Sequence, residues 1–399
     1  MKRLAWQTGS LLAVLAVAGP LSAQQPEIKL SGQVRPRLEG RTPVNDSWDL
    51  FTSMRVRAAL EARLESQVRV FVQFQDVRIF GEEGNTLGDY RADNFDLHQG
   101  YLELGAVPKV GGVFRVGRQE MALGEQRLVG AVNWAQQARS FDGARYTTPA
   151  LGKVRLDVFG MKLRDETAGT QEFDSNFLGA WGNLDMEEIG SLDLFGLFVT
   201  DSRDQGSDLQ TFGALWRATA GPLRLRVEGS LQGGSRGGEN VSAHMLGISA
   251  GGDISDKGTL TVLFDHLSGD KDPDDGESGV FNTLFATNHI FYGLADYFTD
   301  IPAHTGGLGL RDLGVKFSYS TGAQTRLGVD VHHFSTAQEG SLSTRTLGNE
   351  LDLTLTHRLT RELGVTTGYS FFQARAGMEE LGRLTEDGHW LYLMLDAAF

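Results

Sequence analysis

The chain has 399 residues, with 51 glycines, 9 prolines, no cysteine and a formal net charge of −14. Without cysteine it can form neither a disulfide nor a zinc–thiolate site, and the acidic balance argues against a nucleic-acid partner. The mean hydropathy of −0.22 and the lack of a second long apolar run exclude a helical membrane protein. A soluble β-rich protein and a β-barrel of an outer membrane remain.

Residues 1–23 predict a secretory signal peptide. Lys2 and Arg3 precede an apolar stretch over residues 11–18, and small residues end at Ala23. This order is typical of a cleaved export signal, and the apolar stretch is too short to span a bilayer. We therefore expect export, cleavage after Ala23 and a single domain over residues 24–399.

The rest of the chain alternates apolar and polar residues with the period of two that places successive side chains on opposite faces of a strand. In residues 28–39, for example, Leu30 and Val34 alternate with polar residues such as Arg35. We predict eighteen strands of roughly ten residues, the length that a tilted transmembrane strand requires, with sixteen as the alternative. The predicted strands are 28–39, 50–64, 67–77, 94–105, 112–119, 139–147, 153–163, 175–184, 190–200, 209–219, 223–232, 241–252, 258–267, 311–319, 324–334, 347–357, 362–374 and 388–399. The facing of 139–147 and 209–219 stays open.

The connections between these strands alternate in length. Links such as 65–66 and 220–222 are brief, whereas 120–138 and 268–310 are long, and 233–240 is also expected to be a longer loop. Short turns at one rim and long loops at the other are typical of outer-membrane barrels. We therefore predict an all-β fold, a transmembrane antiparallel β-barrel in outer-membrane lipid, with periplasmic turns and extracellular loops. A soluble sandwich also buries apolar strand faces, so strand pattern alone leaves that alternative open.

Two features of the strand ends fit the membrane interpretation. Aromatic residues near strand ends are expected to form interfacial girdles. They are Trp48, Phe51, Tyr101, Trp181, Trp216, Tyr319, Tyr369, Trp390 and Tyr392. The terminal Phe399 closes an alternating strand, which predicts delivery to the barrel-insertion machinery.

Charge is distributed unevenly along the chain. Residues 27–164 contain 20 Lys and Arg against 17 Asp and Glu, whereas residues 165–399 contain 15 against 34. In a barrel the polar strand face must be the lumen, because an arginine facing lipid at mid-depth costs roughly 2–4 kcal/mol. Guanidinium groups pair with carboxylates and line anion-selective pores. The expected pore-lining residues are Lys29, Arg35, Arg37, Arg55, Arg57, Arg69, Arg115 and Arg155. Alternatively, interleaved glutamates such as Glu61 and Glu103 neutralise the arginines in a cross-strand ladder that only supports the wall.

An acidic segment over residues 268–277 has aspartates at alternate positions: Asp270, Asp272 and Asp274. The glycine that an EF-hand requires sits one place late, and Phe281 stands where the twelfth-position glutamate belongs. The segment is therefore no EF-hand. A solvated acidic loop is expected, with weak calcium binding as the alternative, and no other cofactor is expected.

Enzymatic motifs do not occur in the sequence. It contains no G-x-S-x-G, H-E-x-x-H or P-loop pattern. His332 and His333 adjoin on one predicted strand and so point to opposite faces, which makes a poor metal pair. We do not expect an enzyme, although a barrel hydrolase could assemble serine and histidine without a local motif.

Two stretches carry a family resemblance. Residues 117–146 contain Gly-Arg-Gln-Glu, Gln-Arg-Leu-Val-Gly, Asn-Trp and Arg-Ser-Phe-Asp-Gly, and residues 264–298 join an acidic run to Phe-Asn-Thr-Leu-Phe-Ala-Thr-Asn-His. Both resemble blocks of the alginate-export outer-membrane porins. The resemblance implies an eighteen-stranded barrel whose arginine-rich, electropositive constriction selects an anionic polysaccharide and is partly occluded by inward-folded loops. It carries Arg118, Arg127, Arg139 and Asp142 over as pore-loop or constriction residues; their alternative role is to pin a long loop through Arg–Asp pairing.

The sequence thus predicts an outer-membrane channel for anionic sugars or an acidic exopolysaccharide such as alginate, with a periplasmic secretion partner as a candidate for delivery. A general anion-favouring porin for small solutes is the second hypothesis. A barrel enzyme or adhesin is the third. The direction of transport and the loop that closes the pore are left open by the sequence.

Overall fold

The computed structural model describes residues 26–399, apart from 45–46, 65–66, 82–94, 109, 166, 169–170, 173 and 203–205. The predicted signal peptide and its cleavage point lie outside these described residues. Within them, neither of the two short helices is long and apolar enough to cross a membrane. These helices are α1 (Ile301–His304) and α2 (Ala376–Glu380).

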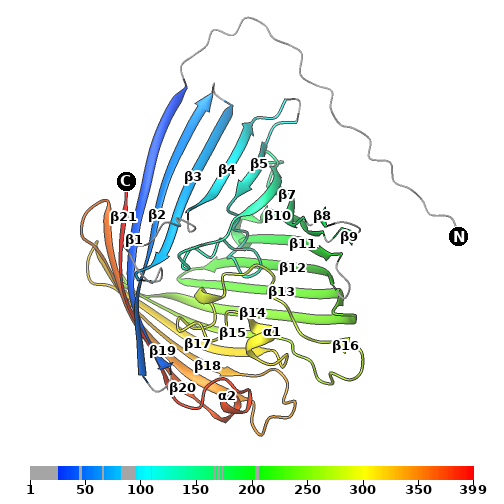
Figure 1. Cartoon of the computed structure of the whole chain (residues 1–399), viewed down its shortest axis with the longest axis vertical. Coiled ribbons are helices and arrows are strands. Elements are labelled where there is room, and N and C mark those ends of the chain that lie inside the picture. The colour runs from blue at the N-terminus through cyan, green and yellow to red at the C-terminus, as the bar shows by residue number, and fades with distance from the viewer. Residues whose placement is uncertain are drawn as a thin grey trace, which may run out of the picture.

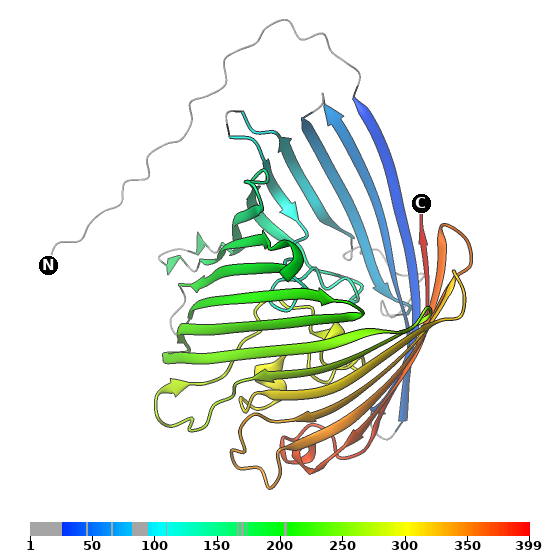
Figure 2. The ribbon, with the colours of Figure 1, turned by 180° about the vertical axis from the view of Figure 1, so that it is seen from behind.

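Eighteen long strands pair antiparallel, each with the next long strand in the chain, and β1 also pairs with β21. The sheet therefore closes into a barrel, whose curved wall is seen from two sides in Figure 1 and Figure 2. The wall strands are β1 (Glu27–Val44), β2 (Ser47–Leu64), β3 (Val68–Ile79), β4 (Phe95–Gly105), β5 (Val113–Gln119), β6 (Phe141–Thr147), β7 (Val154–Arg164), β10 (Ser175–Asp185), β11 (Ser191–Asp201), β12 (Ser207–Ala220), β13 (Leu223–Arg236), β14 (Glu239–Ser255), β15 (Gly258–Leu267), β17 (Leu310–Ser320), β18 (Thr325–Ser335), β19 (Thr346–Arg358), β20 (Leu363–Ala374) and β21 (Gly388–Ala398).

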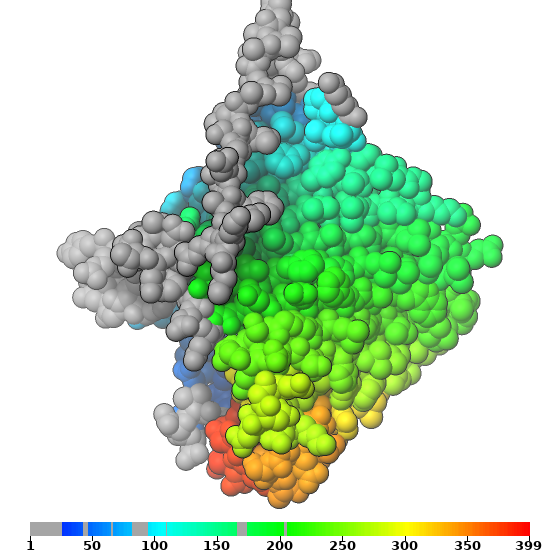
Figure 3. Space-filling model, turned by 90° about the vertical axis from the view of Figure 1, so that its right-hand side faces the viewer, coloured from blue at the N-terminus to red at the C-terminus, as the bar shows by residue number. Residues whose placement is uncertain are grey.

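The remaining elements are short and lie in the connections. They are β8 (Thr167–Ala168), β9 (Gln171–Glu172), β16 (Glu277–Ser278) and two 3-10 turns, η1 (Glu187–Ile189) and η2 (Asn288–Ile290). The prediction of an antiparallel barrel of eighteen strands is confirmed, and each predicted range overlaps one wall strand. Seen from the side where β8, β9 and β16 lie, the segment that holds β10–β14 forms one continuous surface (Figure 3).

The alternation of side chains along the strands sets the two faces of the wall. Leu30 of β1 is 77% exposed on the outer face, whereas Arg35 and Arg37 of the same strand are buried on the inner face. Leu60 of β2 and Leu102 of β4 are likewise exposed outward. The apolar face therefore contacts lipid and the arginine-bearing face lines the lumen, as the cost of arginine in lipid requires.

Phe399 completes the closure of the barrel. Its backbone N–H donates to Gly32 O at 3.1 Å, and Gly32 N–H donates to Phe399 O at 2.7 Å. The ring is 76% exposed and lies over Gly32, where a Cβ would come within 2.5 Å of it. The terminal residue thus joins the last strand to the first.

Two expectations about the wall are wrong. The link predicted over 233–240 is only a two-residue turn, because Gly237 and Gly238 take positive φ (63° and 91°) and let β13 and β14 continue almost to each other. Four aromatic residues predicted for the interfacial girdles are buried instead, because they belong to the inner face and pack inside the barrel. They are Tyr101, Trp181, Trp390 and Tyr392.

The inner face of β6 and β12 carries apolar residues, which leaves the facing of these two strands undetermined by the sequence pattern. In β12, Leu209 and Leu215 are buried on the inner face, whereas Gln210 and Phe212 are exposed on the outer face. In β6, Phe141 is buried inside and Asp142 is exposed. Apolar residues occur on both faces because chain segments fold into the lumen here and pack against the wall.

Candidate functional site: the loop-filled constriction

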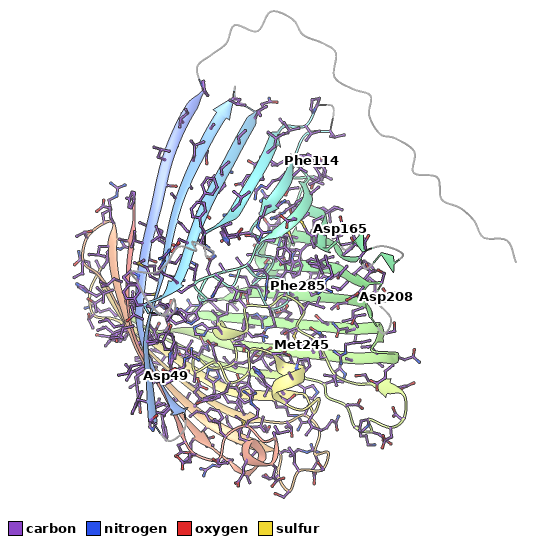
Figure 4. The ribbon with its side chains drawn as sticks, viewed as in Figure 1. Asp49, Phe114, Asp165, Asp208, Met245 and Phe285 are labelled. Atoms are coloured by element: carbon purple, nitrogen blue, oxygen red, sulfur yellow. The ribbon has the colours of Figure 1, made fainter. Side chains whose placement is uncertain are left out.

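Two connections fold into the barrel and meet there. We call residues 120–140, between β5 and β6, the constriction loop, and residues 268–309, between β15 and β17, the second inward loop. Gly130 N–H donates to Phe285 O at 2.8 Å, and Phe285 N–H donates to Leu128 O at 2.9 Å. Phe285 of the second loop, labelled in Figure 4 with Met245 of the wall, packs against the apolar cluster to which Met245 belongs. The two loops thus form a backbone-paired plug.

The plug has an apolar core that it shares with the wall. Leu128 and Val129 of the constriction loop and Phe281 of the second inward loop are almost fully buried. Inward side chains of the wall, such as Phe177 and Leu197, belong to the same cluster. Burial of this apolar surface holds the loops in place and narrows the lumen.

Four arginines of β1 and β2 hold the constriction loop from the wall side. Each is less than 10% exposed, so the loop covers them. They are Arg35, Arg37, Arg55 and Arg57. Because the residues of β1 and β2 pair with Arg35 opposite Arg55, the four side chains form one cluster on the inner face.

The donors of this arginine cluster point at backbone carbonyls of the loop. Arg35 donates to Asn133 O at 2.8 Å and to Trp134 O at 3.2 Å. Arg37 donates to Trp134 O at 2.9 Å, and its guanidinium lies 4.4 Å from the centre of the Trp134 ring. Arg55 donates to Asn133 O and Gln136 O, both at 3.4 Å. Carbonyl groups of an irregular loop need such partners when water is excluded.

The positive charge of the arginine cluster is only partly neutralised. Arg37 pairs with Glu39 at 2.8 Å, and Arg57 lies 3.3 Å from Glu120. Arg35 and Arg55 have no carboxylate within 4 Å among the described residues. Within 4 Å, the four guanidinium groups of the cluster therefore have only two carboxylate partners among the described residues.

Glu120 anchors the beginning of the constriction loop. Its carboxylate lies 2.6 Å from His98 Nε2 and 3.3 Å from Arg57 Nη1. Burial by itself raises the pKa of Glu120, but the hydrogen bond with His98 and the charge of Arg57 outweigh it and hold the pKa below its ordinary value. The loop is thus fixed at its first residue by a charged group.

Arg127 anchors the middle of the same loop. Its Nη1 is 2.8 Å from both Asp265 Oδ2 of β15 and the Tyr292 hydroxyl of the second inward loop, and Glu228 of β13 lies 3.3 Å from Nε. Burial would lower the pKa of Arg127, but the charge of Asp265, the Tyr292 hydroxyl and the charge of Glu228 together raise it. This buried cluster joins both loops to the wall.

The other residues carried over from the family resemblance lie near the ends of the loop. Arg139 donates to Ala286 O at 3.4 Å and so joins the two loops. Arg118 and Asp142 stand at directly opposed positions of β5 and β6 and pair at 2.7 Å, partly exposed. Arg127 thus pins the loop to Asp265 of β15, which is the alternative role raised for this set, whereas Arg118 and Asp142 pair the two strands that flank the loop.

The remaining arginines predicted for the lumen are more accessible and mostly form ladders. Arg69 pairs with Glu61 at 2.8 Å, and Arg115 pairs with Glu103 at 2.5 Å. Both guanidinium groups also lie against the Tyr101 ring, at 5.5 and 4.3 Å from its centre. The two remaining residues of the predicted set are exposed: Lys29, which pairs with Glu27 at 3.1 Å, and Arg155.

In the acidic segment over 268–277, aspartate side chains accept hydrogen bonds from backbone N–H groups of the same segment. Asp270 accepts Asp272 N–H at 3.2 Å, and Asp272 accepts Asp274 N–H at 3.3 Å. In the described part of the chain, no group of three or more histidine and acidic side chains is placed to hold a metal ion. Calcium binding by Asp270, Asp272 and Asp274 stays a prediction.

Several residues at the constriction were missed by sequence reasoning. Trp134 stacks on His289 with ring centres 4.4 Å apart, and its edge meets Trp390 and Tyr392 of β21 at 5.7 and 4.9 Å. In the sequence, the Asn133-Trp134 pair stands out only as part of a family block. Local periodicity could not place it against β21, which lies more than 250 residues away along the chain.

A cavity of about 800 Å³ opens in the lumen below the constriction loop, toward the rim of the short turns. Wall residues of β12 and β13 form one side, the turn that contains η1 forms another, and the loop contributes Glu125. The charged lining residues are Glu125, Asp185, Glu187, Glu188, Arg217, Arg224 and Arg226. This space is of the size that accommodates a small ligand.

Comparisons with known proteins agree with this geometry. The sequence model of a family described as alginate export matches residues 27–303. Among solved structures, OccK3 (OpdO) of Pseudomonas aeruginosa is similar at a TM-score of 0.66 and 13% identity, covering 94% of this chain and 96% of that one. The outer membrane protein OprD of Pseudomonas aeruginosa gives 0.64 and 12%, covering 95% and 96%. OccAB4 of Acinetobacter baumannii gives 0.62 and 9%, covering 96% and 100%. No curated protein matches the sequence.

Proposed function

The chain belongs to the alginate export family, and from this membership and the charge at its constriction we propose that it passes anionic sugars or an acidic exopolysaccharide such as alginate. It is a porin-like barrel channel of the bacterial outer membrane. The family and the fold are those of porin channels, which are not enzymes. The proposal therefore concerns which solutes the channel favours.

The observation that carries the proposal is the unneutralised part of the arginine cluster. Four guanidinium groups gather where the constriction loop covers the inner face of β1 and β2, with Glu39 and Glu120 as their carboxylate partners. A low-dielectric wall focuses the field of such charges into the lumen, which concentrates anions and repels cations. The cluster acts through its field, because the constriction loop covers the side chains.

More accessible arginines supply direct contacts in this proposal. Arg69 and Arg115 flank the Tyr101 ring, and Arg217 and Arg226 lie on the wall of the cavity below the loop. Guanidinium groups bind carboxylates in two-pronged geometry, and aromatic rings pack against sugar rings through their apolar faces. Acidic sugars offer both features.

Ion selectivity in planar lipid bilayers tests the proposal. We expect the wild-type channel to prefer anions in a salt gradient, and the double variant Arg35→Gln with Arg55→Gln to lose much of that preference. Among the described residues, neither arginine has an ion-pair partner that the substitution would leave unpaired. Arg63→Gln is the control, because Arg63 is half exposed and, among the residues that the structure describes, pairs with Glu61 alone at the periplasmic end of β2. A cation preference of the wild type, or a preference that the double variant leaves unchanged, would contradict the role of the cluster.

One observation favours a second function, passage of small anionic solutes in general. The plug formed by the two inward loops has a buried apolar core and takes up part of the lumen, which favours short solutes over a polymer. Measuring conductance block by uronate oligomers of increasing length separates the two functions. A polymer channel admits the longer oligomers from the periplasmic side, whereas a small-solute porin admits only the shortest.

A further inference from the structure

The tip of the constriction loop presents a carboxylate to the wall of the periplasm-facing cavity. Gln126 N–H donates to Leu123 O at 3.0 Å, which closes a tight turn with Gly124 and Glu125 at its corners. Gly124 takes a positive φ of 55° and lies so close to Trp181 that a Cβ would come within 2.6 Å of the ring. A glycine fits both demands, and Glu125 next to it projects into the cavity.

The partner of Glu125 is a wall arginine. Arg226 of β13 pairs through Nε with the Glu125 carboxylate and through Nη2 with Glu228. The Arg226 side chain is 11% exposed, whereas that of Glu125 is 36% exposed. The carboxylate from the loop therefore sits on the solvent side of the arginine.

A second arginine stands beside the first. Arg217 of β12 is directly opposite Arg226 in the strand register, so the two guanidinium groups share one face of the wall. Like charges at directly opposed positions repel each other and require anions between or around them. Arg217 has the wall carboxylate Asp193 at 2.8 Å. By contrast, the carboxylate that contacts Arg226 from the cavity side is that of Glu125 in the constriction loop.

We propose that Arg217 and Arg226 form a carboxylate-binding subsite on the periplasmic side of the constriction, which the chain's own Glu125 occupies and which a uronate carboxylate takes when an acidic sugar enters. Glutamate and uronate both carry a carboxylate with two acceptor oxygens, so the two carboxylates compete for the Nε and Nη donors of Arg226. An oligomer has the advantage over Glu125 of further contacts to Arg217 and Arg224 within the same cavity. This inference rests on the proposed acidic-sugar specificity and assigns the first subsite of the path.

If the two carboxylates compete, removing the Glu125 carboxylate should strengthen the binding of a uronate carboxylate. We would titrate the folded full-length protein in detergent with tri-galacturonate, using maltotriose as the neutral probe, and follow the heat of binding. Glu125→Gln should bind tri-galacturonate about tenfold tighter than the wild type, the change expected when one charge-assisted hydrogen bond no longer competes. Maltotriose binding should be the same in both proteins.

A matched control separates displacement from a general change in charge. Glu188 lines the same cavity on an exposed turn, so Glu188→Gln removes an equal charge without touching Arg226. It should change affinity by about twofold or less, because exposed charges are screened. Adding Arg226→Gln to Glu125→Gln should abolish the gain.

Each result decides between definite outcomes. Equal affinity of the wild type and Glu125→Gln, or an equal gain in Glu188→Gln, overturns the competition while leaving acidic-sugar specificity standing. No binding of tri-galacturonate to either protein overturns the subsite and the proposed specificity together.

Discussion

Arg127 and Asp265 are 138 positions apart in the chain, and their side chains form a 2.8 Å ion pair inside the barrel. The pair joins the constriction loop to β15, and the Tyr292 hydroxyl adds the second inward loop to the same guanidinium. Three segments of the chain thus share one buried cation. The plug is a part of the folded barrel, held by specific polar contacts as well as by its apolar core.

Loss of this cation should loosen the plug. Arg127→Leu leaves the carboxylates of Asp265 and Glu228 buried with less compensation, so we expect the free energy of unfolding in lipid vesicles to fall by about 3–5 kcal/mol. The single-channel conductance should rise because the loop is freed. Arg118→Gln is the control, since its partly exposed pair with Asp142 should contribute about 1 kcal/mol or less. Equal effects of the two variants would contradict the assignment of Arg127 as the anchor.

Trp134 should set the position of the loop near β21. Trp134→Ala removes the stack on His289 and the contact with Arg37, each of the kind that contributes roughly 0.5–1.5 kcal/mol. We expect larger current fluctuations in planar bilayers, with a barrel that still folds. Trp216→Ala, on the outward face of β12 near the periplasmic rim, should leave the current steady. A steady current in both variants would show that Trp134 does not hold the loop.

Acidification should release the beginning of the constriction loop. Because the folded-state pKa of Glu120 is depressed, its stabilising contribution is present above the unfolded pKa of about 4.3 and is lost as the pH falls through the lower folded value. Wild-type channels should therefore become noisier below about pH 4. Glu120→Gln should lack this acid-dependent step and resemble the acidified wild type at neutral pH. Identical pH profiles for both proteins would argue against this anchor.

Gly293 provides a steric test of how closely the second inward loop approaches the wall. Its φ is +82°, and a Cβ there would come within 2.5 Å of the Glu350 carboxylate of β19. Gly221, in a periplasmic turn, has a φ of +61° with nothing within 4 Å. Gly221→Ala should cost about 1–2 kcal/mol from backbone strain alone, and Gly293→Ala should cost more because the loop must also shift. Similar unfolding free energies for the two variants would contradict the close approach.

The strands could be predicted from the sequence because a barrel wall separates lipid from lumen at every second residue. Leu30 and Arg35 illustrate the signal: one must face lipid and the other must avoid it. The same signal failed at Leu209 and Gln210, where the inner face is apolar because the plug packs on it. A tertiary contact had inverted the local pattern, and no local window contains that information.

For the candidate site, the sequence predicts which residue types line the lumen but not which groups they contact. The arginines of β1 and β2 were expected in the lumen, where the structure places them, but their burial under the constriction loop depends on carbonyls about 100 positions away. Arg35 and Asn133 O show this dependence, since a backbone acceptor carries no sequence signature. The pairing of Arg127 was foreseen as an alternative, whereas its partner Asp265 was not. The contact of Glu125 with Arg226 depends on the position of the loop tip against β13, which no local sequence pattern contains.

The most direct measurement of the central proposal is block of small-ion current by oligosaccharides in a planar bilayer. Wild-type channels should be blocked by a short uronate oligomer added to the periplasmic side, and a neutral oligosaccharide of the same length should leave the current unchanged. Equal block by the neutral oligosaccharide, or a current that neither compound alters, would contradict the proposal that this barrel favours acidic sugars.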